Sequence, residues 1–135
     1  MKSGKDAATT GVIAPDDPEH DHDLDALEHR AEHVAARLAE LANAKRLLIL
    51  CHLARKDAEA GAEGPGEATV GELQRAVGLG QSALSQHLAR LRTAGMVATR
   101  RESQTIHYRI ADEETRAIMR GLYDTFCGHQ APHDR

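Results

Sequence analysis

The segment 69–110 constrains the fold most, because it places two short helices, a tight turn and a hairpin in direct succession. Thr69 and Glu72 have the spacing of a capping box, which starts a helix, and Gly78 supplies the left-handed residue that ends it. After Gly78-Leu79-Gly80, apolar periodicity predicts a second helix over 81–93. Its inner face carries Leu84, Leu88 and Leu91.

The outward face of the helix over 81–93 is small and polar. At about 100° per residue, Ser82, Gln86 and Ala89 lie opposite the leucines. They are flanked by Ser85, Arg90 and Arg92. Ser and Gln side chains can read base edges in a DNA groove, while arginines hold phosphate oxygens. An ordinary solvated helix face is the alternative interpretation.

A hairpin is expected directly after this helix. Gly95 ends the helix, and apolar and polar residues alternate over 97–101 and 105–110 around a tip at 102–104. The strands carry arginines, so the hairpin forms a wing that can lie against the DNA backbone or the minor groove. This context favours DNA binding over the solvated-face alternative.

Three further helices complete the expected fold. The first, from near Asp23 to Leu41, has one apolar stripe, the second spans 44–55 at the centre of the core, and the last spans 112–127. The last helix has no further partner in its own chain, which favours pairing with the first helix across a twofold axis. The expected fold is therefore mainly α with a β-hairpin wing, a winged helix-turn-helix, in a homodimer.

Composition bounds the rest of the chain. With 135 residues and 2% aromatic residues, it forms one domain, expected over 23–128, with an aliphatic core. Residues 1–22 and 129–135 are expected to be tails, and the Gly- and Glu-rich segment 56–68 a flexible surface connection without chemical function. No apolar run approaches the length of about 20 residues that a membrane span needs, nor is there a signal peptide, so we expect a cytoplasmic protein without membrane contact.

The net charge of -4 does not exclude DNA, because the charge is unevenly distributed. Residues 1–42 hold four Lys and Arg against ten Asp and Glu, whereas residues 71–110 hold six Arg against two Glu. Phosphate contacts depend on local positive charge. The polar residues line an outer helix face and a hairpin rather than a pocket, so we expect no enzyme and no cofactor. A pure protein-interaction module would leave the polar helix face and the arginines unused.

The stretch VGELQRAVGLGQSALSQHLARLRTAGMVATRRESQTIHYRI resembles the DNA-binding core of ArsR/SmtB repressors, and the resemblance extends over residues 24–128. It implies a dimer that binds a palindromic operator and releases it on an inducing signal. By the family's pattern, Arg100 and Arg101 belong to the wing. The recognition contacts would be Gln81, Ser82, Ser85, Gln86 and His87. A packed, partly buried histidine is the alternative for His87.

The resemblance also bears on the inducer. LLILCHLA and LYDTFCG resemble the segments that carry the sensing thiols of the SqrR/BigR subgroup, which responds to persulfides and related reactive sulfur species. It implies that Cys51 and Cys127 of one protomer are joined by a bridge of sulfur atoms that weakens DNA binding. A general thiol-oxidation sensor remains open, as does Cys51 as a small apolar residue of a packed helix.

Zinc or nickel sensing is the second hypothesis, because the chain has nine histidines. The family's usual metal patterns are missing: residues 71–77 contain no Cys, and the last helix begins with ADEETR, without His. His29 and His33, four residues apart, could still bind a metal ion. Further ligands would come from His20, His22, His129 or His133. Solvated histidines in acidic flanks are the favoured interpretation, so no metal is predicted.

Overall fold

The computed structural model describes residues 18–128. The chain divides into two compact units, Met1–Leu38 and Ala39–Arg135. The first contains α1 (Pro18–His29) and most of α2 (Ala31–Leu41). One helix starting near Asp23 was expected here, and this prediction was wrong in detail. The helix starts at Pro18 and is interrupted at Arg30, whose N–H donates to the carbonyls of both Ala26 and Leu27, at 3.2 and 3.1 Å, which tightens the turn locally.

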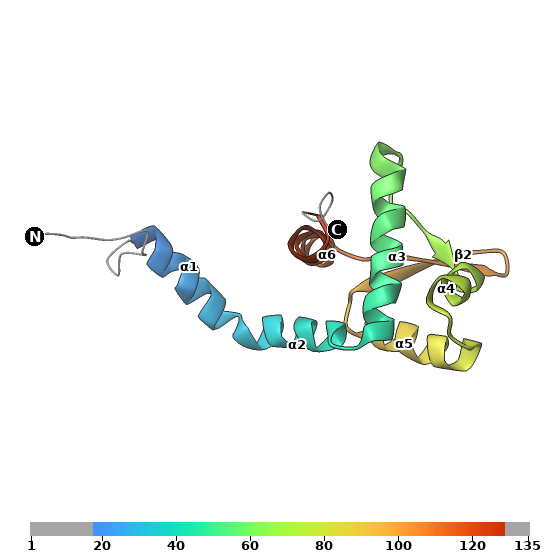
Figure 1. Ribbon diagram of the computed structural model, residues 1–135, viewed down its shortest axis with the longest axis horizontal. Coiled ribbons are helices and arrows are strands. Elements are labelled where there is room, and N and C mark those ends of the chain that lie inside the picture. The colour runs from blue at the N-terminus through green and yellow to red at the C-terminus, as the bar shows by residue number, and fades with distance from the viewer. Residues whose placement is uncertain (1–17, 129–135) are drawn as a thin grey trace, which may run out of the picture. The chain divides into compact units, whose positions relative to one another are not determined.

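The central helix of the second unit is α3 (Ala44–Ala60). It starts at Asn43, whose side chain accepts a hydrogen bond from the Arg46 N–H at 3.0 Å. Ile49, Leu50 and Leu53 have no exposed surface, so this helix forms the centre of the core, as predicted. Figure 1 shows α3 with α6 on one side and α4, α5 and the hairpin on the other.

The two helices predicted from the capping box and the glycine turn are present. They are α4 (Val70–Val77) and α5 (Gln81–Thr93). The Glu72 N–H donates to Thr69 Oγ1 at 3.2 Å, and the Thr69 N–H donates to Glu72 Oε1 at 2.8 Å, which completes the capping box. Gly78 ends α4 with φ +68°, and Lys45 Nζ donates to the last carbonyl of α4 at 3.1 Å.

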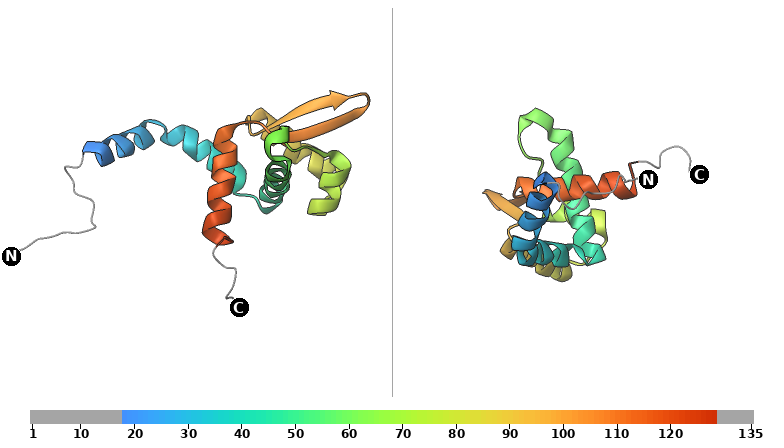
Figure 2. Two further views of the ribbon diagram at one scale, coloured as in Figure 1. Left: turned by 90° about the horizontal axis from the view of Figure 1, so that it is seen from above. Right: turned by 90° about the vertical axis from the view of Figure 1, so that its left-hand side faces the viewer.

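The hairpin consists of β2 (Val97–Glu102) and β3 (Thr105–Ile110). Val97 pairs with Ile110 at its base and Glu102 with Thr105 at its tip, where Ser103 has φ +59°. A strand that was not expected, β1 (Ala68–Thr69), pairs antiparallel with β3 to give the order β1-β3-β2. Figure 2 shows the hairpin extending beyond the helices of its unit.

The interpretation of residues 56–68 as a flexible connection was wrong. Helix α3 continues to Ala60, because Lys, Asp, Ala and Glu are compatible with a helix, and Gly61 ends it with φ +58°. A short 3-10 turn, η1 (Gly61–Glu63), follows. Gly66 is buried, and a Cβ atom there would collide with the Lys56 carbonyl, so this segment packs closely against α3.

Helix α6 (Glu113–Phe126) starts at Asp112, whose side chain accepts from the Thr115 N–H at 3.0 Å. Met119 is buried in the core, while Tyr123 and Phe126 keep 62% and 67% of their surface exposed. Arg116 Nε on this helix donates to Asp57 of α3 at 2.9 Å. Within residues 18–128, no helix combines the length and the apolar character needed to cross a bilayer.

Candidate nucleic-acid interface and thiol pair

The exposed face of α5 carries most of the predicted recognition residues. Leu84, Leu88 and Leu91 are buried beneath it, as the helical period requires. The exposed side chains are Gln81, Ser82, Ser85, Gln86 and Arg92. His87 is only partly buried and lies on the flank of this face. The helix therefore presents hydrogen-bonding groups in a row on an element anchored by its opposite face.

Arg90 of α5 is engaged within the protein. Its Nε donates to Glu40 Oε1 at 2.7 Å. The same carboxylate oxygen lies 3.6 Å from Nε of Arg46, a buried side chain of α3 whose Nε donates to the Glu40 carbonyl at 2.8 Å. Glu40 thus links α3 to the C-terminal half of α5. Sequence reasoning missed this residue, because the contact joins positions far apart in the chain.

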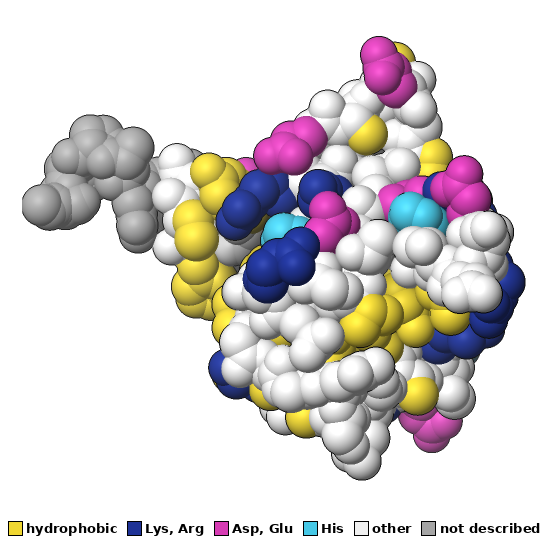
Figure 3. Space-filling view, turned by 90° about the vertical axis from the view of Figure 1, so that its right-hand side faces the viewer, with side chains coloured by type: hydrophobic (Ala, Val, Ile, Leu, Met, Phe, Trp, Pro, Cys, Tyr) yellow, Lys and Arg dark blue, Asp and Glu magenta, His cyan; other side chains and the backbone are white. Residues whose placement is uncertain are grey.

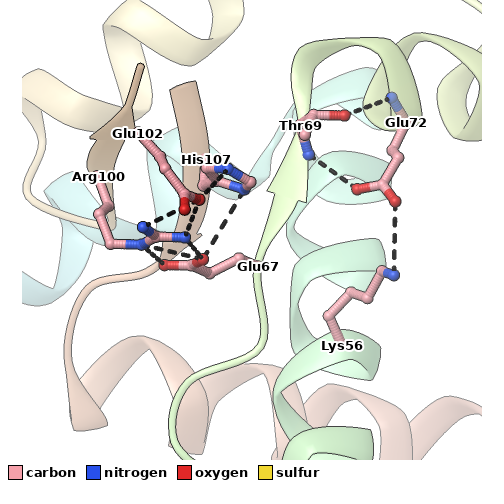
Figure 4. Close-up of polar contacts among 7 residues, drawn as sticks. All are labelled: Lys56, Glu67, Thr69, Glu72, Arg100, Glu102 and His107. Carbon is pink, nitrogen blue, oxygen red and sulfur yellow. Dashed lines mark hydrogen bonds and ion pairs between the residues drawn. The ribbon is translucent and has the colours of Figure 1, made fainter. Parts of the chain in front are cut away.

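The two predicted wing arginines differ in their surroundings. Arg101 is exposed, and its side chain makes no ion pair with another residue of the described range. Arg100 is bound to Glu67, with Nη2 donating to Oε1 at 2.8 Å and Nε to Oε2 at 3.0 Å. Glu102, beside it on the hairpin, lies 3.5 Å from Arg100 Nη1. Figure 4 shows these side chains converging.

Glu67 is the negatively charged side chain that faces the basic residues of the hairpin. The hydrogen bond from Arg100 lowers the pKa of the Glu67 carboxyl below its usual value, and this outweighs the opposing effect of burial. The charges of Arg100, His107 and Arg109 lower this pKa further. The same contact raises the pKa of Arg100. On the side where the hairpin lies, acidic side chains sit beside basic ones and a histidine (Figure 3).

The two cysteines come from two helices that contact each other. Cys51 lies on α3, Cys127 forms the C-cap of α6, and both are exposed. Partial burial raises the pKa of the Cys51 thiol, the charge of Cys127 raises it further, and Arg55 lowers it. Cys51 is therefore exposed in the single chain, but its raised pKa keeps the reactive thiolate fraction small at neutral pH. The two thiols lie near enough to interact electrostatically.

His52, next to Cys51, has a different environment. Its Nε2 is buried without a hydrogen-bond partner in the described part of the chain. Burial lowers the pKa of His52, and the charges of Lys56 and Arg55 lower it further, against the opposing charges of Glu72 and Glu59. The imidazole is therefore neutral at neutral pH and adds no positive charge beside the thiol.

Of the histidines in the metal hypothesis, the structure describes the side chains of His29 and His33. Among the described side chains of residues 23–128, no three His, Cys, Asp or Glu are placed to hold a metal ion. Nδ1 of His29 lies 2.9 Å from the Asp25 carbonyl oxygen within α1. His129 and His133 lie outside the described residues, as do residues 1–17, and the side chains of His20 and His22 are not described.

The sequence is similar to known regulators of transcription. Residues 43–99 match the family described as bacterial regulatory protein, arsR family. The chain is 41% identical over 104 residues to the biofilm growth-associated repressor of Agrobacterium fabrum, covering 77% of this chain and 80% of that protein.

Solved structures show the same fold. The transcriptional repressor BigR from Xylella fastidiosa matches with a TM-score of 0.66 and 37% identity, over 76% of this chain and 95% of that one. The homodimeric winged helix-turn-helix DNA-binding domain from Mycobacterium bovis matches with a TM-score of 0.62 and 29% identity, over 80% and 91% of the two chains. The predicted fold is therefore confirmed.

Proposed function

The chain belongs to the ArsR family of bacterial regulatory proteins and is a regulator of transcription rather than an enzyme, and we propose that it represses genes by binding a palindromic operator as a homodimer. The observation that carries this proposal is the exposed Ser and Gln face of α5, held by buried leucines beside an arginine-bearing hairpin. A helix of this kind fits the major groove, where Ser and Gln hydrogen-bond to base edges. Such a regulator acts where the chromosome lies, in the cytoplasm.

In this proposal, the groups that touch DNA have separate roles. Gln81, Ser82, Ser85, Gln86 and His87 reach base edges or the adjoining backbone, whereas Arg92 and Arg101, both exposed, contact phosphate. Arg90 and Arg100 also belong to the interface, but each is bound to a carboxylate, Glu40 and Glu67, before DNA arrives. Their phosphate contacts require these ion pairs to open or to share the guanidinium group.

Dimerisation is supported by the C-terminal helix and by a structural relative. Tyr123 and Phe126 lie near each other at the end of α6 and expose most of their surface, so a partner protomer that covers both would remove this area from water. The similar domain from Mycobacterium bovis is homodimeric. A twofold dimer would place two copies of α5 at successive major grooves, which is why the expected operator is palindromic.

We further propose that Cys51 and Cys127 form the sensor for persulfides. One thiolate attacks the outer sulfur of a persulfide RSSH, forming protein–SSH and releasing RS⁻. The other cysteine is persulfidated in the same way, and its terminal sulfur attacks the inner sulfur of the first group, which releases HS⁻ and leaves a three-sulfur bridge. If the second thiolate attacks before it is persulfidated, the product is a disulfide without added sulfur. The contact between α3 and α6, together with the effect of Cys127 on the pKa of Cys51, supports this pairing.

A single experiment tests DNA binding and the choice of inducer. An operator is selected from random duplexes with the reduced protein, and its affinity is then measured for reduced, persulfide-treated, peroxide-treated and zinc-loaded samples. Loss of affinity only after persulfide treatment, with an intramolecular cross-link carrying added sulfur in the mass spectrum, supports the proposal. Loss with peroxide as well indicates a general thiol-oxidation sensor, and loss with zinc alone indicates the metal hypothesis.

A further inference from the structure

Glu67 occupies a fixed position beside the hairpin. Gly66 before it is buried against the Lys56 carbonyl of α3, where a larger residue would collide. Ala68 after it is fully buried and pairs with Tyr108 in the sheet. With both neighbours held by packing, the Glu67 backbone cannot move away from the hairpin without disturbing the core. Its carboxylate is therefore held beside the hairpin in the folded protein.

The carboxylate of Glu67 faces the group that DNA phosphate would bind. Arg100 presents two donors to it, Nη2 at 2.8 Å and Nε at 3.0 Å, in the geometry in which arginine also binds phosphate. His107 Nδ1 lies 3.8 Å from the same carboxylate. Arg101, the next residue, makes no such pair within residues 18–128. Of these two neighbouring arginines, only Arg100 is therefore paired with Glu67.

We propose that Glu67 is an intramolecular competitor of DNA phosphate for Arg100 and so limits the affinity of the wing for DNA of any sequence. This inference rests on the proposed function, because it requires the hairpin to meet DNA. An occupied arginine neutralises no phosphate and releases no counterion until its internal partner is displaced. The contribution of Arg100 to binding is therefore smaller than that of an unpaired arginine at the same place.

The test measures salt dependence with full-length, reduced protein and a short random-sequence duplex. Glu67→Gln removes the competing charge, and we expect it to tighten binding about two- to fivefold for each protomer, the range of an exposed ion pair. The plot of log affinity against log salt should steepen by about one for each arginine that becomes available. The control is Glu113→Gln, which removes the same charge from an exposed residue that pairs with Arg116 on α6. It should leave the slope unchanged.

A second pair of variants assigns the effect to Arg100. Arg100→Gln and the double variant Glu67→Gln with Arg100→Gln should have the same salt slope, because both proteins lack the arginine for which Glu67 and phosphate compete. The inference would be overturned, with the proposed function intact, if Glu67→Gln left the affinity for DNA unchanged or weaker. It would also be overturned if Glu67→Gln raised the affinity equally in the Arg100→Gln background. A wild-type protein without affinity for any duplex would overturn both.

Discussion

The thiol of Cys127, at the C-terminal end of α6, lies close enough to the thiol of Cys51 on α3 for its charge to raise the pKa of Cys51. Burial acts in the same direction, and Arg55, one helical turn after Cys51, acts against both. The raised pKa keeps most of the Cys51 thiol protonated at neutral pH, and Arg55 is the group that favours its reactive thiolate form.

The first prediction concerns the alkylation rate of Cys51 as a function of pH. Because the pKa of Cys51 is raised, its thiolate fraction stays small at neutral pH and grows only as pH rises through the raised value. Replacing Cys127 by Ser removes one cause of the increase and should speed alkylation of Cys51 at pH 8, whereas Arg55→Gln should slow it. Rates are measured by mass spectrometry of the peptide containing Cys51.

The control for this prediction is Arg75→Gln on α4, which also loses one positive charge but is not among the groups that shift the Cys51 pKa. Its alkylation rate should equal that of the wild type. A Cys127→Ser variant with unchanged Cys51 reactivity would show that the two thiols do not interact in solution.

The second prediction concerns the recognition face of α5. Ser82→Ala and Gln86→Ala each remove a side chain that is exposed in the free protein, so the midpoint of unfolding should change little. Each lost base contact should weaken binding to the selected operator by about 1–3 kcal/mol, while binding to random DNA stays nearly constant. Thr125→Ala, exposed on α6, serves as the control. Equal losses on both kinds of DNA would assign these residues to phosphate rather than to bases.

Local signals carried the fold prediction. The capping box of Thr69 and Glu72 and the glycine at 78 depend on neighbouring residues only, so they could be identified without a structure. The end of α3 was missed because the glycines and the proline that follow obscured the helix-forming residues 56–60. The resemblance, rather than any pattern of spacing, pointed to Cys51 and Cys127 as a pair.

The acidic partners of the DNA-facing arginines could not be predicted. Glu40 and Glu67 lie far in sequence from Arg90 and Arg100, and such ion pairs follow from tertiary packing, which has no sequence period. No local pattern marks Glu67, because the strand that follows it, β1, has only two residues and leads directly into helix α4.

The third prediction concerns the capping box of α4. Thr69→Ala removes the acceptor for the Glu72 N–H and should lower the free energy of unfolding by about 1 kcal/mol. The hydrogen bond from the Thr69 N–H lowers the pKa of Glu72 in the folded protein. The stability that this ionised group adds is therefore present at neutral pH, above the unfolded pKa, and is lost as pH falls through the lowered folded value.

Urea unfolding of wild type and Glu72→Gln at pH 7 and pH 4 measures this contribution. The difference in unfolding free energy between the two proteins should shrink at the lower pH. Glu113→Gln, at an exposed position, provides the comparison. A Glu72→Gln variant whose stability loss is equal at both pH values would show that the carboxylate charge is not what the capping box uses.

The fourth prediction concerns the dimer. Tyr123 and Phe126 lie on the same helix as the core residue Met119, yet they are 62% and 67% exposed in the single chain. Covering two aromatic side chains is among the largest contributions that an interface can receive, because each removes much apolar surface from water. Replacing both by Ala should weaken self-association by at least about tenfold, measured by sedimentation equilibrium. Asp124→Ala, between them, should have little effect.

Operator binding by the Tyr123 and Phe126 variant should fall at low protein concentration and recover at high concentration, because one protomer reads only half of a palindrome. If the variant stays dimeric, the interface lies elsewhere. A bridge at Cys127, at the end of α6, could then not weaken DNA binding by changing the dimer interface.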